Sequence, residues 1–188
     1  MTKKDEIIYE SLKLFSTNGF EAVSTRMIAR AVHASDAVIY KHFKNKQEIL
    51  DTIVEICRKR FVEKRQTVDI NHMCWEDVEA ICMDMFRFQT HDEWIVMFRK
   101  LLVVEQFKNP QMAELYKAIF IDTAVEGMTY MFTELINAGY LKEGNPRVYA
   151  MELYAPFFMY HTVNTDEEEL LKDLEEHVTY FRRNYRTV

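Results

Sequence analysis

Apolar side chains recur every three or four residues along most of the chain, which is the spacing of one face of an α-helix. The first such stripe consists of Ile7, Ile8, Leu12, Leu14 and Phe15. Thr2 and Asp5 can form a capping box where this helix begins. Gly19 is placed to end it, because glycine readily adopts the left-handed backbone found at helix C-termini.

Two shorter helices follow, separated by a turn of three residues. Ser24 can cap a helix over residues 25–31, and Ser35 can cap another that runs through Phe43. The segment Val32-His33-Ala34 forms the turn. A helix, a three-residue turn and a second helix have the spacing of a helix-turn-helix unit.

The remaining pattern is also helical. A connecting helix over residues 47–68 carries a stripe that includes Leu50, Cys57 and Phe61. Capping boxes at Thr90/Glu93 and Thr165/Glu168, Asn-Pro pairs at 109–110 and 145–146, and Gly139 predict further helices at residues 75–89, 91–107, 110–138, 146–163 and 166–185. We therefore predict an all-α protein with a helix-turn-helix domain at 1–46 and a helical domain at 47–188.

Composition narrows the class of protein further. Glycine and proline make up only 7 of 188 residues, too few for the turns of an architecture with many short strands. No run of 18 apolar residues occurs, and the first residues lack an apolar signal core, so we expect a cytoplasmic protein without a membrane partner. Cys57, Cys74 and Cys82 are interpreted as reduced thiols; a metal or redox role, with His72 beside Cys74 and Cys82, is the alternative.

The net charge of −6 is unevenly distributed. Residues 1–50 carry 8 basic and 6 acidic side chains, a net charge of +2, and the rest carry 16 and 24, a net charge of −8. A mildly basic N-terminal quarter on an acidic body indicates a module that faces a polyanion.

The segment from Leu14 to Leu50 resembles the DNA-binding domain of the tetracycline-repressor (TetR) family. The matching features are Phe15, Gly19-Phe20, Ser24-Thr25, Ile28-Ala29, Ala34-Ser35, Ile39-Tyr40, Phe43, Lys46 and Glu48. The resemblance implies a homodimer that binds a double-stranded DNA operator and responds to a small-molecule effector. Two positions depart from the family pattern: His33 replaces a common glycine, and Asp36 stands where small, polar or basic residues are usual.

Histidine tolerates the positive φ that this turn requires. Asp36 has two interpretations that the sequence leaves open: it suits the N-terminal dipole of its helix, or it accepts a hydrogen bond from a cytosine amino group.

The helix-turn-helix spacing itself predicts which side chains face DNA. Ser35, Asp36, Ala37 and Lys41 lie nearest the base edges if the second helix of the unit enters the major groove. Phosphate contacts are predicted for Thr25, Arg26, Tyr40 and His42, and the family resemblance adds Lys46.

Methionine and aromatic residues accumulate after residue 71, which favours an apolar effector cavity over simple core packing when they are taken together. The predicted cavity residues are Met83, Phe86, Trp94, Phe98, Phe120, Tyr130, Met131, Tyr154 and Phe157. The last two helices are predicted to form a dimer interface, as the family does, through Tyr149, Leu153, Leu170, Leu174, Val178 and Phe181.

No enzyme motif is present: the chain lacks H-E-x-x-H, G-x-S-x-G, a P-loop and any Glu-x-x-His pair, and we expect neither a cofactor nor a metal. The sequence therefore predicts a repressor of the TetR type that an apolar or aromatic effector releases from a palindromic operator. Two alternatives are a constitutive DNA-binding dimer and a helical adaptor that binds a protein through its methionine-rich surface.

Overall fold

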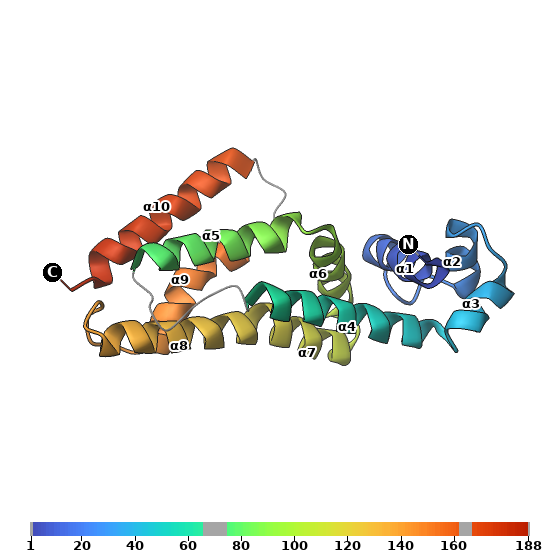
Figure 1. Ribbon diagram of the computed structural model, residues 1–188, viewed down its shortest axis with the longest axis horizontal. Coiled ribbons are helices and arrows are strands. Elements are labelled where there is room, and N and C mark those ends of the chain that lie inside the picture. The colour runs from blue at the N-terminus through green and yellow to red at the C-terminus, as the bar shows by residue number, and fades with distance from the viewer. Residues whose placement is uncertain (1, 66–74, 162–166, 188) are drawn as a thin grey trace. The chain divides into compact units, whose positions relative to one another are not determined.

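The protein is described here by a computed structural model that places residues 2–65, 75–161 and 167–187. Within these ranges nearly all residues are helical, and the only β pairing is a single bridge between Leu141 and Arg186 (Figure 1). The predicted all-α class is confirmed.

The first four helices begin and end close to where the sequence predicts. They are α1 (Lys3–Asn18), α2 (Thr25–Ala31), α3 (Asp36–His42) and α4 (Lys46–Arg65). The capping box is present, with the Asp5 amide donating to Thr2 Oγ1 at 3.2 Å and the Thr2 amide donating to Asp5 Oδ2 at 2.9 Å. Gly19 follows α1 with φ of +83°, and Ser24 Oγ accepts from the Met27 amide at 3.3 Å.

Six α-helices and one π-helical segment make up the rest of the described chain. They are α5 (Trp75–His91), α6 (Glu93–Glu105), α7 (Pro110–Tyr116), the π segment η1 (Lys117–Asp122), α8 (Thr123–Asn137), α9 (Pro146–Tyr160) and α10 (Glu167–Tyr185). Gly139 has φ of +77° just beyond α8, as its predicted role requires.

The predicted cap of the 91–107 helix is wrong. Asp92 is the N-cap of α6, where its Oδ1 accepts from the amides of Trp94 at 3.1 Å and Ile95 at 3.2 Å. The hydroxyl of Thr90 instead donates back to the Phe86 carbonyl at 2.8 Å, inside α5. The carboxylate of Asp92, two residues beyond Thr90, satisfies two amides and takes the cap position in place of the threonine. The second predicted capping box includes Thr165, which lies outside the described residues.

The predicted helix over 110–138 is interrupted by the π segment. Its wider turn is matched by contacts between residues five apart: Lys117 pairs with Asp122 at 2.6 Å, and Thr123 Oγ1 donates to the Ala118 carbonyl at 2.8 Å. The hydroxyl of Tyr154, on α9, donates to the Phe120 carbonyl. Periodicity cannot reveal such a segment, because the apolar stripe on either side is ordinary.

The chain folds as two compact units. The first consists of Met1–Arg65 and His91–Tyr116, and the second of Gln66–Thr90 and Lys117–Val188. The predicted domains, 1–46 and 47–188, divide the chain by function rather than by packing and stay a prediction.

In the first unit, α6 lies along α1. The Tyr9 hydroxyl donates to Glu93 Oε1 at 2.6 Å, and its ring lies 5.8 Å from that of Trp94. At the other end of α6, Glu105 Oε1 accepts from the Phe20 amide at 2.9 Å. Since α1 packs on the helix-turn-helix pair, α6 is fixed to the same body as α2 and α3.

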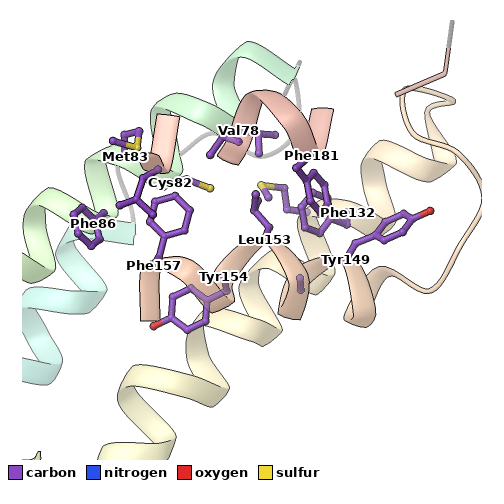
Figure 2. Packing of buried hydrophobic residues seen from close by; sticks show 14 of the residues in the cluster. Val78, Cys82, Met83, Phe86, Phe132, Tyr149, Leu153, Tyr154, Phe157 and Phe181 are labelled. Carbon is purple, nitrogen blue, oxygen red and sulfur yellow. The ribbon is translucent and has the colours of Figure 1, made fainter. Parts of the chain in front are cut away.

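The second unit encloses an aromatic core drawn from α5, α8, α9 and α10 (Figure 2). Trp75 stacks on Phe181 with ring centroids 5.9 Å apart, and Phe132 stacks on Phe181 at 5.5 Å. Phe86 contacts Phe157 edge-to-face at 5.7 Å.

Candidate nucleic-acid interface

The turn between α2 and α3 has the geometry that the sequence predicts. The His33 amide donates to the Arg30 carbonyl at 3.1 Å, and the Ala34 amide donates to the Ala29 carbonyl at 2.8 Å. His33 has φ of +50°, a left-handed conformation that glycine adopts more easily. The turn therefore forms without glycine, and α3 starts at the expected residue.

Burial of apolar side chains sets which face of α3 remains exposed. Ile28 and Ala29 of α2 are buried, as are Ile39 and Phe43 at α3 and its end. Packing on this side leaves the opposite side of α3, with Ala37, Tyr40 and Lys41, exposed to solvent. These are three of the residues that the sequence predicts to face DNA.

Two hydroxyl groups meet where α2 and α3 come together. Thr25 Oγ1 and the Tyr40 hydroxyl oxygen lie 3.4 Å apart, and Tyr40 is 56% exposed. Tyr40 is therefore not a core side chain. A pair of exposed hydroxyls can donate to one phosphate group.

Arg26 and Asp36 form an ion pair beside these hydroxyls. Arg26 Nε lies 3.8 Å from Asp36 Oδ2, and their side chains are 74% and 43% exposed. The pair joins the first turn of α2 to the first turn of α3. The Arg26 guanidinium therefore lies next to the Asp36 carboxylate, for which the sequence allows two roles.

The other predicted contacts around α3 divide by exposure. Ser35 occupies the N-cap position of α3, but its exposed hydroxyl makes no capping hydrogen bond. His42 is half-buried at the end of the same helix. Ser35 is thus available to a ligand in the groove.

Lys46 has structural contacts that its predicted phosphate role does not include. Its Nζ donates to the Phe20 carbonyl at 2.6 Å and to the Glu21 carbonyl at 3.5 Å, and lies 4.2 Å from the centre of the Phe20 ring. Replacing Lys46 would therefore disturb the α1–α2 loop as well as any DNA contact, so other residues make cleaner tests.

Sequence reasoning missed Glu105. It is 4% exposed, and the Phe20 amide donates to it. Glu105 lies on the same helical stripe as Phe98, Leu101 and Leu102, all fully buried. An acidic residue at helical spacing with buried apolar residues predicts that its carboxylate is also buried and accepts a hydrogen bond there.

The predicted effector residues are distributed over both units. Trp94 and Phe98 lie in the first unit, where Trp94 packs near Tyr9 and Arg60. The second unit holds the other seven, of which Tyr130 is 53% exposed and the following six are buried: Met83, Phe86, Phe120, Met131, Tyr154 and Phe157.

Figure 2 shows four of these buried residues, Met83, Phe86, Tyr154 and Phe157, in the core of the second unit. His161 adds a polar ring to this region: it stacks on Phe86 at 5.5 Å and lies edge-on to Tyr154 at 6.3 Å. His161 was not among the predicted site residues, because an isolated histidine carries no pattern.

The six predicted dimer residues are buried within a single copy of the chain. Each is at most 8% exposed and belongs to the core of the second unit: Tyr149, Leu153, Leu170, Leu174, Val178 and Phe181. Helical spacing reveals that a face is buried but not whether a partner buries it. Different side chains on these helices must make any contact between two copies.

The described cysteines are buried and unreactive in character. Burial raises the pKa of both the Cys57 and the Cys82 thiol to about 12. Within residues 2–65, 75–161 and 167–187, no three His, Cys, Asp or Glu side chains gather into a possible metal site. His72 and Cys74 lie outside these ranges.

Among the placed helices, none is both long and apolar enough to cross a membrane.

Comparison with known proteins supports the helix-turn-helix interpretation. The sequence model of the bacterial regulatory proteins of the tetR family matches residues 7–53. IcaR, the negative transcriptional regulator of the biofilm operon icaADBC in Staphylococcus epidermidis, is 35% identical over 60 residues. This match covers 32% of either protein, so the chain spans about a third of the length of that curated relative.

Solved structures show that the fold extends over the whole chain. A protein described as a TetR-family transcriptional regulator from Mesorhizobium loti has a TM-score of 0.72 at 19% identity, covering 98% of this chain and 97% of that one. SmeT in complex with triclosan has a TM-score of 0.72 at 23% identity, with coverage of 100% and 93%. SmeT is the repressor of a Stenotrophomonas maltophilia multidrug efflux pump.

IcaR, the Mesorhizobium loti protein and SmeT are each described as transcriptional regulators. The matched residues are also those that build α1, α2, α3 and the start of α4. Residues 7–53 thus match the tetR family of bacterial regulatory proteins, and the chain shares its fold with the solved structures described above.

Proposed function

We propose that the protein is a cytoplasmic transcriptional repressor that binds a two-fold related operator as a homodimer. The observation that carries the proposal is the exposed surface of α2 and α3, where Arg26, Ser35, Tyr40 and Lys41 project from the family's DNA-binding domain. One such surface makes few contacts, so two copies on one operator are needed for useful affinity. The named role of IcaR as a negative regulator favours repression.

Selection of bound sequences from a random DNA library tests DNA binding. The full-length protein should enrich an inverted repeat, and gel shifts on that repeat should weaken in Tyr40→Phe and Lys41→Ala. Lys108→Ala is the matched control, because Lys108 is an exposed lysine of the first unit that belongs to neither α2 nor α3. Equal affinity of Lys41→Ala and Lys108→Ala would reject this face, provided that helicity is unchanged.

We propose further that an apolar aromatic compound is the effector, and that it binds among Phe86, Phe157 and His161 in the second unit. Aromatic rings supply stacking surface, and the imidazole supplies one polar contact that orients a ligand. The triclosan complex of SmeT makes triclosan a suitable first probe. Effector binding would lower DNA affinity through a coupling free energy, typically about 1–3 kcal/mol.

Titration calorimetry with triclosan and related phenols tests this site. Binding should be lost in Phe157→Ala and retained in Tyr130→Ala, since Tyr130 is exposed while Phe157 is buried. Release of DNA by the same compound would separate an effector-responsive repressor from a constitutive DNA-binding dimer.

For the homodimer, we propose the outward face of α9. Val148, Met151 and Met159 are 52%, 54% and 53% exposed and recur at helical spacing with Ala155. Apolar side chains on both faces of one helix indicate that a second surface covers the outer one. Light scattering should show that Met151→Glu or Met159→Glu yields monomers. Phe107→Glu, which charges an exposed apolar side chain of the first unit, should remain dimeric.

A further inference from the structure

We propose that Arg26 and Asp36 act together to read one C·G base pair in each half of the operator. The proposal rests on the DNA-binding function proposed above and adds the base pair that this surface selects. It also assigns a role to the acidic residue that departs from the family pattern.

The pair is placed where a groove-reading element would have to be. Arg26 lies in the first turn of α2 and Asp36 in the first turn of α3, with Nε and Oδ2 3.8 Å apart. The Thr25 and Tyr40 hydroxyls, 3.4 Å apart, hold the same two helices side by side. Arg26 is largely exposed and Asp36 is partly exposed, and an ion pair at the surface contributes little to stability. Folding alone therefore gives no strong reason for it.

The guanidinium also removes the main objection to a carboxylate on a DNA-binding face. A lone carboxylate repels phosphates, whereas a carboxylate paired with Arg26 adds no net charge to the surface. Asp36 can then act as an acceptor toward bases without weakening the electrostatic attraction that Lys41 and other cations supply.

The donors and acceptors of the pair match the major-groove edge of C·G. A carboxylate only accepts, and the cytosine N4 amino group is a donor without an acceptor beside it on the same base. The guanine partner presents O6 and N7, which suit the two-pronged donation of arginine. Cytosine N4 and guanine O6 are neighbours because they form a hydrogen bond with each other. The adjacent Asp36 carboxylate and Arg26 guanidinium can therefore bind both atoms.

An A·T pair fits less well. Adenine N6 is also a donor, but N7 of the same base is an acceptor that would face the carboxylate, and thymine offers arginine only O4 beside a methyl group. The geometry of the pair therefore favours C·G over A·T at this position.

Sequence selection with variants of the full-length protein tests the proposal. The wild type should prefer C·G at one position of each half-site by about tenfold, the size expected for a good bidentate contact. Asp36→Ala and Arg26→Ala should each reduce the preference at that same position and leave the others unchanged. Asp36→Asn should shift the preference toward adenine, because asparagine donates and accepts in the pattern that adenine presents.

Glu114→Gln is the matched control, since it removes one negative charge from an exposed site on α7. It should leave every base preference unchanged. The proposal is overturned if Asp36→Ala alters no position, or if Asp36→Ala and Arg26→Ala alter different positions. If the wild type enriches no sequence at all, the proposed DNA-binding function fails first, and the pair proposal fails with it.

Discussion

Gly19 meets two requirements at once. Its φ of +83° lies in the region that side chains with a Cβ disfavour, and a Cβ built there would lie 2.6 Å from Glu105 Oε1. That oxygen is the one to which the Phe20 amide donates. Backbone strain and a collision with a buried carboxylate therefore act against the same substitution.

Gly19→Ala should lower the free energy of unfolding by about 2–4 kcal/mol, combining the left-handed strain with a disturbed buried hydrogen bond. Gly127→Ala is the control, because a Cβ at that helical position meets nothing within 4 Å. It should be neutral or stabilising by about 0.5–1 kcal/mol. Urea unfolding measures the free energy of unfolding of both variants. Equal changes would contradict the prediction, because they would mean that Glu105 moves away from the added Cβ without loss of stability.

Because of the buried thiols, the free energy of unfolding should vary with pH in the alkaline range. In the unfolded chain a thiol ionises near its ordinary pKa of 9.0, whereas burial holds the pKa of Cys82 at about 12 in the folded protein. The folded state thus keeps a proton that the unfolded state loses, so the free energy of unfolding falls as pH rises above 9. The expected slope is about 1.4 kcal/mol per pH unit for each thiol.

Denaturant unfolding at several pH values between 8 and 11 measures this slope. Cys82→Ala should fall less steeply than the wild type by the contribution of one thiol. Identical slopes would mean that Cys82 is accessible to solvent in the folded protein.

At the scale of elements, the start of α6 depends on Asp92. This carboxylate caps the helix through Oδ1, and its Oδ2 accepts from Arg60 of α4 at 2.6 Å. Asp92→Ala should lower the free energy of unfolding by about 1–2 kcal/mol through loss of the cap alone. Thr90→Ala, at the residue that the sequence selects as the cap, should change stability less. Thermal unfolding compares the two variants, and the reverse order would return the cap to Thr90.

The helices could be predicted because their signals are local. Asn-Pro pairs, Gly139 and the regular apolar stripes each act within one turn, and the observed helices follow them closely. The π segment could not be predicted in this way. Its contact with the Tyr154 hydroxyl, which reaches the Phe120 carbonyl from 34 residues away in the sequence, leaves no local signal.

In the candidate site, too, features set by local sequence were predicted, and features set by tertiary contacts were not. The turn at His33 and the exposed positions of α3 follow from local spacing and were predicted. Lys46 and Glu105 take their roles from the Phe20 backbone, which only the folded chain brings to them. The predicted dimer face was assigned to buried residues, because periodicity does not distinguish a core from an interface.

For the whole molecule, the uneven charge predicts strongly salt-dependent DNA binding. Each phosphate contact releases counterions, so the logarithm of the affinity should fall with the logarithm of salt concentration by about 0.9 per contact. Lys41→Ala should reduce this slope, because it removes a cation from the surface that faces DNA, whereas Lys108→Ala should not. Fluorescence anisotropy on the selected operator at several salt concentrations measures it, and a slope near zero would contradict recognition through phosphates.

The π segment also says where the length of this chain can vary. Contacts between residues five apart accommodate one residue more per turn than a regular α-helix does. Removing a single residue from Lys117–Asp122 would let α7 run into α8 as one uniform helix, with the apolar stripes on both sides still in register. If an aligned relative is one residue shorter, we expect the missing residue to fall within Lys117–Asp122. That relative would lack the hydrogen bond between the Tyr154 hydroxyl and the Phe120 carbonyl.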